Sequence, residues 1–368
     1  MKHDARDETL RAVLIEDTPR EMADIRETLE GIGGLTVVEV VYRGPELTVR
    51  DALSKKPHVV LVDFRLVRPP RGQHVLPSQG SSLAALLKEK DRMPDTPVFL
   101  ISLGRLTKEE PLIHIQATPR SFDGLLIKED IHGDPDGTVA KICAVVSGYR
   151  RLAAKRMRTR QGLFALLGAR EADFDVLLKA DPPPSLVANR WDVTEGAQWV
   201  RHTLMAYPGI LYDDLTAACF LGLSLGSFGS SKVAEFFAEA RYGGPFFEES
   251  KRWWKSLLLR KATTYMLDAK EPGPPMAFGQ LWRRKNRATK LSHCTSSGEE
   301  PADCVCYVLR EPVRREYSLP YRPDARPAIM DEARVSYRAI REARKGFDPS
   351  LVAPDARSLI DHIRNKTQ

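Results

Sequence analysis

The chain has little of what marks a membrane, secreted or disulfide-bonded protein. Its 368 residues contain no run of the roughly 18 apolar residues that a membrane-spanning helix needs. The charged start, MKHDARDETLR, lacks the apolar centre of a secretion signal, so none is expected. Only five cysteines are present, an odd number, which argues against a disulfide framework. These absences predict a cytoplasmic protein with no membrane partner.

Positive charge is in excess and is unevenly distributed. The net charge is +7, and two basic blocks stand out, YRRLAAKRMRTR at 149–160 and LWRRKNRATK at 281–290. Such blocks can contact an anionic partner, nucleic acid among them. The plainer interpretation is a solvated helix face and a surface loop. The length leaves room for two domains, each with its own core.

The first third alternates short apolar runs with segments of helical periodicity. Strands are predicted at 11–17, 36–42, 58–63, 96–102 and 122–128, with helices at 18–34, 44–56 and 81–92 between them. Strands that alternate with helices predict a parallel sheet with both faces covered, which explains why strand 58–63 is apolar throughout. The predicted fold class is therefore α/β, with an N-terminal doubly wound five-stranded parallel sheet and a mostly α-helical C-terminal module.

Polar side chains stand where these strands end, which is where open sheets of this kind bind ligands. They are Glu16 and Asp17 after the first strand, Asp63 at the third, Ser102 at the fourth and Lys128 at the fifth. Carboxylate oxygens suit Mg²⁺, and a carboxylate can attack phosphorus. A lysine and a hydroxyl can hold phosphoryl oxygens. The joint pattern predicts one pocket for phosphoryl chemistry.

Four segments, VLIEDTPREM, PHVVLVDFRL, PVFLIS and GLLIKED, resemble in this order the landmarks of the receiver domain of bacterial response regulators. The resemblance covers residues 10 to about 148. It implies a flavodoxin-like fold and phosphorelay signal transduction in a two-component system. It implies Asp63 as the phosphoacceptor, with Ser102 and Lys128 as its catalytic partners, and Mg²⁺ held by Glu16, Asp17 and Asp63. The implied upstream partner is a histidine kinase or a GHKL-type ATPase.

Some positions depart from the receiver pattern. Leu103 follows the switch hydroxyl, where a small residue is usual, and Glu129 replaces the usual proline after the lysine. Leu125 stands where an aromatic residue is common. A phosphorylatable site and a receiver used only for docking are both open interpretations.

The loop after Asp63 is longer than usual and reaches Gly80 before the next helix. Its Arg65, Arg68 and Arg71 could clamp a phosphoryl group, hold an acidic partner or occupy the mouth of the pocket.

The remaining two-thirds of the chain show no catalytic motif. We predict a receiver-like domain at 1–148, a basic connecting helix at 149–180 and a mostly helical output or interaction domain at 181–368. The segment 210–244 resembles a helix-turn-helix, with Ala218, Gly222, Phe228 and Val233 at its inner positions. A structural helical bundle and nucleic-acid contact are both open for it. The residues placed for nucleic-acid contact are Ser230, Ser231, Lys232, Arg283, Arg284 and Lys285.

Two further clusters have a structural and a functional interpretation. Trp253 and Trp254 could stack on bases or anchor a core, and core packing is favoured because tryptophans bury a large area. His293, Cys294, Cys304 and Cys306 lie in one segment, but zinc sites usually contain a C-x₂-C pair, which is missing. Free or buried thiols are favoured there.

Three functions are consistent with this sequence. The first is a response-regulator-like signalling protein in which phosphorylation of Asp63 controls the C-terminal module. The second is a receiver that docks a protein partner within a multi-subunit effector or phage-defence complex, and the third is a DNA-binding transcriptional regulator. No enzymatic activity beyond receiver phosphoryl chemistry is predicted. A protein partner for the C-terminal module, DNA and a homodimer are the other expected associations.

Overall fold

The computed structural model describes residues 9–66, 78–89, 92–93, 95–102, 122–154, 160–180, 182–183, 185, 192–322, 333–342 and 347–365. The chain divides into two compact units, one of Met1–Arg158 with Ala188–Gln198 and one of Thr159–Val187 with Trp199–Gln368. Within the described ranges, no helix combines the length and apolar character needed to cross a membrane.

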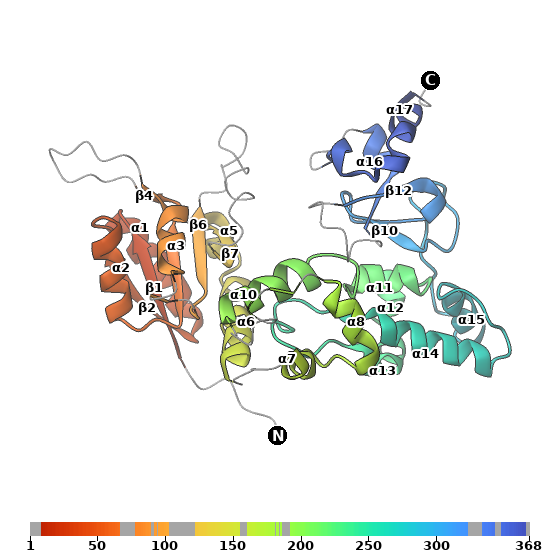
Figure 1. Cartoon of the computed structure of the whole chain (residues 1–368), viewed down its shortest axis with the longest axis horizontal. Helices are drawn as coiled ribbons and strands as arrows, with labels where there is room; N and C mark the ends of the chain where they lie inside the picture. The colour runs from red at the N-terminus through yellow and green to blue at the C-terminus, as the bar shows by residue number, and fades with distance from the viewer. Residues whose placement is uncertain are drawn as a thin grey trace. The chain divides into compact units, whose positions relative to one another are not determined.

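The first unit is built on a five-stranded parallel sheet (Figure 1). Its strands are β1 (Leu10–Glu16), β2 (Leu35–Val41), β3 (Val59–Asp63), β6 (Val98–Ser102) and β7 (Gly124–Ile127). They lie in the order β2-β1-β3-β6-β7, and every neighbouring pair is parallel. This is the flavodoxin-like strand order, in which the chain reverses direction across the sheet beside the first strand. The predicted doubly wound sheet is confirmed.

Helices cover both faces of this sheet. They are α1 (Pro19–Ile32), α2 (Pro45–Ser54), α3 (Gly80–Leu87), α5 (Lys128–Gly133) and α6 (Pro135–Ala154). The helices α2 and α3 pack on one face, where Val49 and Leu83 share a core with Val60 of β3. On the other face α1 contacts α5 and α6. The sheet is thus apolar on both sides because both sides are buried.

The helix and strand ends of this unit follow the sequence signals closely. Pro19 is the first residue of α1, and Gly33, at φ +84°, ends it in a conformation that favours glycine. Thr18 occupies the N-cap position, but its hydroxyl donates to Asp17 Oδ1 at 3.2 Å instead of capping the helix. The short helix α5 was not predicted.

A two-stranded ladder follows the third strand of the sheet. It joins β4 (Arg65–Leu66) to β5 (Ser78–Gln79), pairing Arg65 with Gln79 and Leu66 with Ser78. The helix α3 then begins at Gly80, where a Cβ atom would lie 2.1 Å from the carbonyl oxygen of Asp63, so only glycine fits. The sequence did not predict this ladder, although it did predict that the loop ends at Gly80.

Residues 149–180 do not form one helix. The helix α6 ends at Ala154, α7 is Arg160–Leu167, and Gly168 at φ +71° stops it. The 3₁₀ helix η1 (Glu171–Asp173) and α8 (Phe174–Leu178) follow. The predicted connecting segment is therefore not one continuous helix, because Gly168 adopts a left-handed conformation that ends α7. The predicted domain boundary at 148 falls inside α6.

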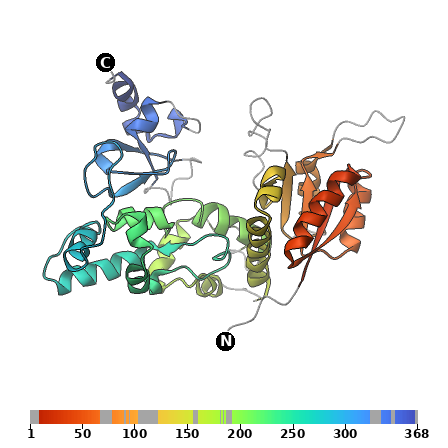
Figure 2. The same cartoon turned by 180° about the vertical axis from the view of Figure 1, so that it is seen from behind.

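The second unit begins with helices and a short strand pair (Figures 1 and 2). After α7, η1 and α8, its elements to residue 285 are η2 (Val200–Leu204), β8 (Leu211–Tyr212), α11 (Asp214–Phe220), α12 (Leu225–Phe228), α13 (Ser231–Phe236), η3 (Ala238–Ala240), β9 (Trp253–Trp254), α14 (Lys255–Asp268) and α15 (Ala277–Lys285). The helix α10 (Val193–Trp199) comes before η2 in the chain and, up to Gln198, belongs to the first unit. Trp253 and Trp254 are 3% and 2% exposed, so the prediction that they anchor a core is confirmed.

The helix-turn-helix-like segment has its predicted inner residues in place. Ala218, Phe228 and Val233 are buried, and Gly222 turns the chain at φ +71°. What the sequence suggested as one second helix is two short ones, α12 and α13, separated at Gly229.

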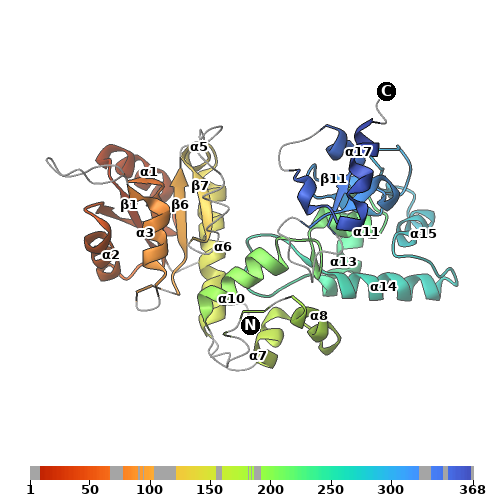
Figure 3. The ribbon, with the colours of Figure 1, turned by 45° about the horizontal axis from the view of Figure 1, so that its top comes forward.

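The end of the chain contains a small mixed sheet that the sequence did not predict (Figure 3). Its strands, β10 (Cys304–Cys306), β11 (Glu311–Val313), β12 (Ser318–Pro320) and β13 (Arg334–Ser336), lie in the order β11-β10-β13-β12. The helices around it are η4 (Arg315–Tyr317), α16 (Tyr337–Arg341), η6 (Pro349–Leu351), η7 (Pro354–Ala356) and α17 (Ser358–Asn365). The mostly helical module therefore includes a four-stranded sheet with its own apolar core.

Candidate functional site

The predicted carboxylates and lysine meet at the carboxyl edge of the parallel sheet. Glu16 ends β1, Asp63 ends β3, and Lys128 is the first residue after β7. The Nζ atom of Lys128 lies 2.9 Å from Asp63 Oδ1 and 3.1 Å from Glu16 Oε2. All three residues are at most 9% exposed. The strand order therefore brings together residues that are more than 100 positions apart in the chain.

A fourth charged residue belongs to this cluster and was missed by the sequence analysis. Glu21, in the first turn of α1, also contacts the ammonium of Lys128. Its carboxylate is about half exposed. The available signal was its position: the first turn of a helix that starts directly after Glu16 and Asp17 must face the same edge.

Backbone N–H groups fix the two buried carboxylates. Asp63 Oδ2 accepts a hydrogen bond from the N–H of Arg65 at 2.8 Å. Glu16 Oε1 accepts from the N–H groups of Asp17 at 3.1 Å and Thr18 at 3.3 Å. Arg65 thus contributes its backbone to the site. Arg68 and Arg71, with which it was grouped, lie outside the described residues.

The remaining predicted residues are also placed at this edge. Ser102 ends β6, the strand next to β3, and is 4% exposed. Asp17 is buried and accepts the hydroxyl hydrogen bond of Thr18. Of the departures from the receiver pattern, Leu125 is half-buried in β7, Glu129 lies in the first turn of α5, and Leu103 lies outside the described residues.

The cluster holds three carboxyl groups around one ammonium, more than that single cation can neutralise. Burial, and then the neighbouring charge of Asp63, raise the pKa of Glu16 to about 8. Burial also raises the pKa of Asp63 above its usual range, although Lys128 opposes the change. Burial alone would lower the pKa of Lys128, but Glu21, Asp63 and Glu16 outweigh it and raise that pKa. One ammonium faces three carboxylates.

The oxygen ligands of this cluster suit a hard divalent cation, but the ammonium of Lys128 lies between Glu16 and Asp63. Glu16, Asp17 and Asp63 supply carboxylate oxygens, which Mg²⁺ prefers, and their surplus negative charge is what a cation would relieve. The Lys128 ammonium bridges Glu16 and Asp63. Among the described residues, no three acidic, histidine or cysteine side chains are placed to hold a metal ion. The Mg²⁺ site stays a prediction.

The six residues predicted for nucleic-acid contact fall into two groups. Ser230, Ser231, Lys232 and Lys285 line one groove of the second unit. Arg283 and Arg284 are outside that lining: Arg283 pairs with Glu300 at 3.3 Å, and Arg284 pairs with Glu271 at 2.6 Å.

The cysteine-rich segment is part of a hydrophobic core. Cys304 and Cys306 lie in β10 and share the buried core of the small sheet with Cys294, and burial raises the pKa of the Cys304 thiol to about 12. His293 is exposed and pairs with Glu300 at 2.6 Å. The favoured interpretation as buried thiols is confirmed for these cysteines.

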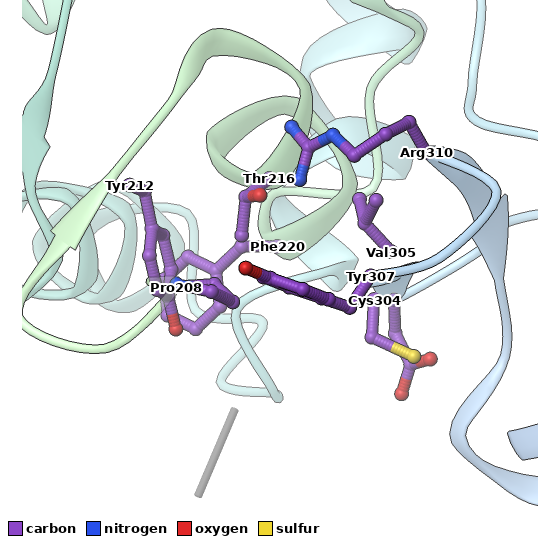
Figure 4. A pocket seen from close by; sticks show the side chains of 9 residues that line it. Pro208, Tyr212, Thr216, Phe220, Cys304, Val305, Tyr307 and Arg310 are labelled. Atoms are coloured by element: carbon purple, nitrogen blue, oxygen red, sulfur yellow. The ribbon is translucent and has the colours of Figure 1, made fainter. Parts of the chain in front are cut away.

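A small pocket lies between α11 and β10 (Figure 4). Tyr212, Phe220 and Tyr307 line it, and Arg310, at its rim, pairs with Asp213. Its volume is about 10 Å³, room for roughly one water molecule. We therefore do not treat it as a ligand site.

Comparison with known proteins gives structural matches only. No family model matches the chain, and no curated protein sequence matches it. The response regulator domain of Thermotoga maritima CheB is 16% identical, covers 38% of this chain and 98% of that chain, and has a TM-score of 0.29. The CheY-like receiver domain from Methylobacillus flagellatus is 16% identical, with 37% and 99% covered and a TM-score of 0.27.

A longer match is RcsB from Salmonella enterica serovar Typhimurium, in a structure bound to the promoter rprA. It is 12% identical, covers 53% of this chain and 100% of that chain, and has a TM-score of 0.28. Sequence identities and TM-scores this low carry no argument. The fold of the first unit is assigned from its strand order, its parallel pairing and the residues at its carboxyl edge. The first unit has a receiver fold.

Proposed function

We propose that this protein is a response-regulator-like signalling protein in which Asp63 accepts a phosphoryl group and thereby controls the C-terminal module. The observation that carries the proposal is the contact between a buried Asp63, at the end of the central strand β3, and the ammonium of Lys128 at 2.9 Å. A ligand-binding sheet edge that holds a buried carboxylate in contact with a cation, and Ser102 at the end of the adjacent strand, has the parts that phosphoryl transfer needs.

In the proposed reaction a carboxylate oxygen of Asp63 attacks the phosphorus of the donor. A new P–O bond forms to Asp63, and the bond between phosphorus and the donor's leaving group breaks, its electron pair departing with that group. The ammonium of Lys128 is placed to hold an oxygen of the transferred phosphoryl group, and the hydroxyl of Ser102 is proposed as a second donor to it.

Mg²⁺ belongs to this proposal through Glu16, Asp17 and Asp63. Bound there, it would supply positive charge against the phosphoryl oxygens and the surplus carboxylates. The proposed upstream partner is a histidine kinase or a GHKL-type ATPase.

Phosphorylation of the full chain by acetyl phosphate, with and without Mg²⁺, tests the proposal. We expect intact-mass spectrometry to find one added phosphoryl group on the wild type and none on Asp63→Asn. The matched control is Asp24→Asn, because Asp24 is an exposed carboxylate on α1 and its loss should change nothing. A phosphoryl group retained by Asp63→Asn would assign the reaction to another residue.

The alternative is a receiver that only docks a protein partner. It is favoured if the wild type stays unmodified and also fails to bind the phosphoryl mimic beryllium fluoride. In that case Asp63→Asn should leave partner binding unchanged, whereas a phosphorylation-controlled complex should respond to acetyl phosphate.

A further inference from the structure

The second unit contains a basic groove separate from the receiver site. The groove lies between the α12–α13 segment and the stretch from the end of α15 to residue 290, and it has a volume of about 680 Å³. Four cationic side chains line it, Lys232, Lys285, Arg287 and Lys290, and all four are exposed. No carboxylate belongs to this lining, which consists wholly of described residues. The groove is therefore suited to an anion.

The two walls of this groove are fastened to each other through the backbone. The N–H of Lys290 donates to Ser227 Oγ at 2.8 Å, and the N–H of Ser224 donates to the carbonyl oxygen of Lys290 at 3.0 Å. Directly beneath, Gly279 of α15 donates its N–H to the carbonyl oxygen of Leu221 at 2.9 Å. The cations are therefore presented by a fixed backbone frame.

The chemistry of the lining favours phosphate as the anion. Hydroxyl groups of Ser230, Ser231 and Thr289 lie among the cations. Lysine, arginine and hydroxyl side chains are the groups that contact nucleic-acid phosphates. A protein partner would instead need a buried apolar anchor at the centre of the surface.

The one aromatic residue of the groove is already engaged in the core. Trp282 stacks on Phe278 at 5.3 Å between ring centroids and contacts Tyr265 at 5.4 Å. Single-stranded nucleic acid is usually held by aromatic rings on which its bases stack. Because the ring of Trp282 is occupied by the core, a duplex, whose bases are paired internally, fits this lining better than a single strand.

We propose that this groove binds the phosphate backbone of double-stranded DNA, with Lys232, Lys285, Arg287 and Lys290 as its cationic contacts. The binding is independent of base sequence, since most of the lining is lysine and hydroxyl side chains, which contact phosphates, and the amide of Asn286 already donates to the carbonyl oxygen of Trp282 at 3.3 Å. The proposal goes beyond phosphoryl transfer at Asp63 and does not depend on it. It excludes Arg283 and Arg284, which pair with carboxylates.

The test is fluorescence anisotropy of the full, unphosphorylated chain with a labelled DNA duplex of random sequence, over a range of salt concentrations. Four phosphate contacts predict that log K falls with log[salt] at a slope of about −3 to −4. Lys232→Glu combined with Lys290→Glu should weaken binding at least about 10-fold at low salt and make the slope shallower by about 2.

The matched control is Arg260→Glu combined with Lys251→Glu, which reverses two exposed cations outside the groove lining and changes the net charge equally. It should bind within about 3-fold of the wild type, a value that allows for general electrostatic attraction. Circular dichroism of each variant checks that the fold is retained.

Three outcomes would overturn the proposal. One is the absence of duplex binding at low salt, and a second is equal weakening by the groove and control variants. The third is tighter binding of the single strand than of the duplex, which would reassign the groove. None of these outcomes bears on Asp63, whose test uses phosphorylation.

Discussion

The strand β7 has a buried lysine–carboxylate cluster at each end, and the two clusters differ in their charge balance. Before β7, Asp123 accepts from Lys88 Nζ at 2.8 Å, from the hydroxyl of Tyr149 and from the N–H of Val98 at 2.8 Å. After β7, Lys128 faces Glu16, Asp63 and Glu21. The first cluster pairs one ammonium with one carboxyl group, while the second has one ammonium for three carboxyl groups.

This difference separates a structural cluster from a chemical one. The charge of Asp123 is neutralised by Lys88, and neutral hydrogen-bond partners complete its environment. Together these contacts tie α6 and the segment after α3 to the sheet. The cluster at Lys128 has more carboxyl groups than one ammonium can neutralise, and burial, followed by the neighbouring charge of Asp63, raises the pKa of Glu16 to about 8. Surplus charge costs stability, and it is also what allows a site to bind a cation or exchange a phosphoryl group.

The largest effect should come from breaking the balanced cluster. Asp123→Ala leaves the ammonium of Lys88 buried without its counter-charge, and Lys88 is 5% exposed. We expect the free energy of unfolding of the first unit to fall by about 3–5 kcal/mol. Urea unfolding followed through hydrogen exchange of the β6 and β7 amides measures it. A loss below about 1 kcal/mol would contradict the structural role given to Asp123.

A pH titration should reveal the unbalanced cluster. The folded-state pKa of Glu16, about 8, lies above its ordinary value of 4.5, so between these values the folded chain holds a proton that the unfolded chain has lost. The stability of the first unit should therefore fall as pH rises through this window, by at most about 1.4 kcal/mol per pH unit from this residue.

The variant Glu16→Gln removes that titration, so its stability should change less with pH over the same window. The matched control is Glu21→Gln, since Glu21 touches the same lysine but is about half exposed. Equal pH profiles for the wild type and Glu16→Gln, measured by urea unfolding at each pH, would show that Glu16 is not the proton-binding group.

The smallest effect should have the opposite sign to the first. Asp63→Asn removes a carboxylate whose pKa burial has raised, while Glu16 and Glu21 still contact Lys128. We expect it to leave stability unchanged or raise it by about 1 kcal/mol at pH 7, whereas the isosteric Asp123→Asn should lower it. Urea midpoints of the two variants, measured side by side, decide this. A clear loss of stability in Asp63→Asn would mean that the cluster at Lys128 is a stabilising structural cluster, like the one at Asp123.

Much of the first unit could be predicted from local patterns, because its strands are mainly apolar and α1 has its own end signals. The edge residues followed from the strand order that such a pattern implies. Glu21 was missed because its one signal, a place in the first turn of the helix that follows Glu16 and Asp17, was not used. The helix α5 was missed because it begins directly at Lys128, where a loop was expected.

In the second unit, the important contacts join distant segments. The strands of the small sheet are three residues each, too short for an alternating pattern to be visible. Arg283 and Arg284 looked equivalent to Lys285 in the basic block, but their partners Glu300 and Glu271 are 17 and 13 positions away. The groove could not be predicted because it forms only where two distant segments meet, and in the sequence each segment resembles an ordinary surface.

Because β4 and β5 pair directly after Asp63, the surroundings of Asp63 do not depend on how much chain joins the two strands. Its pairs, Arg65 with Gln79 and Leu66 with Ser78, hold both ends of that stretch, and Gly80 is packed against the Asp63 carbonyl. With the ends fixed, doubling the length of the intervening chain adds only about 0.6 kcal/mol of closure entropy. The geometry around Asp63 therefore depends on the ladder and on Gly80 rather than on the length of the chain that joins the two strands.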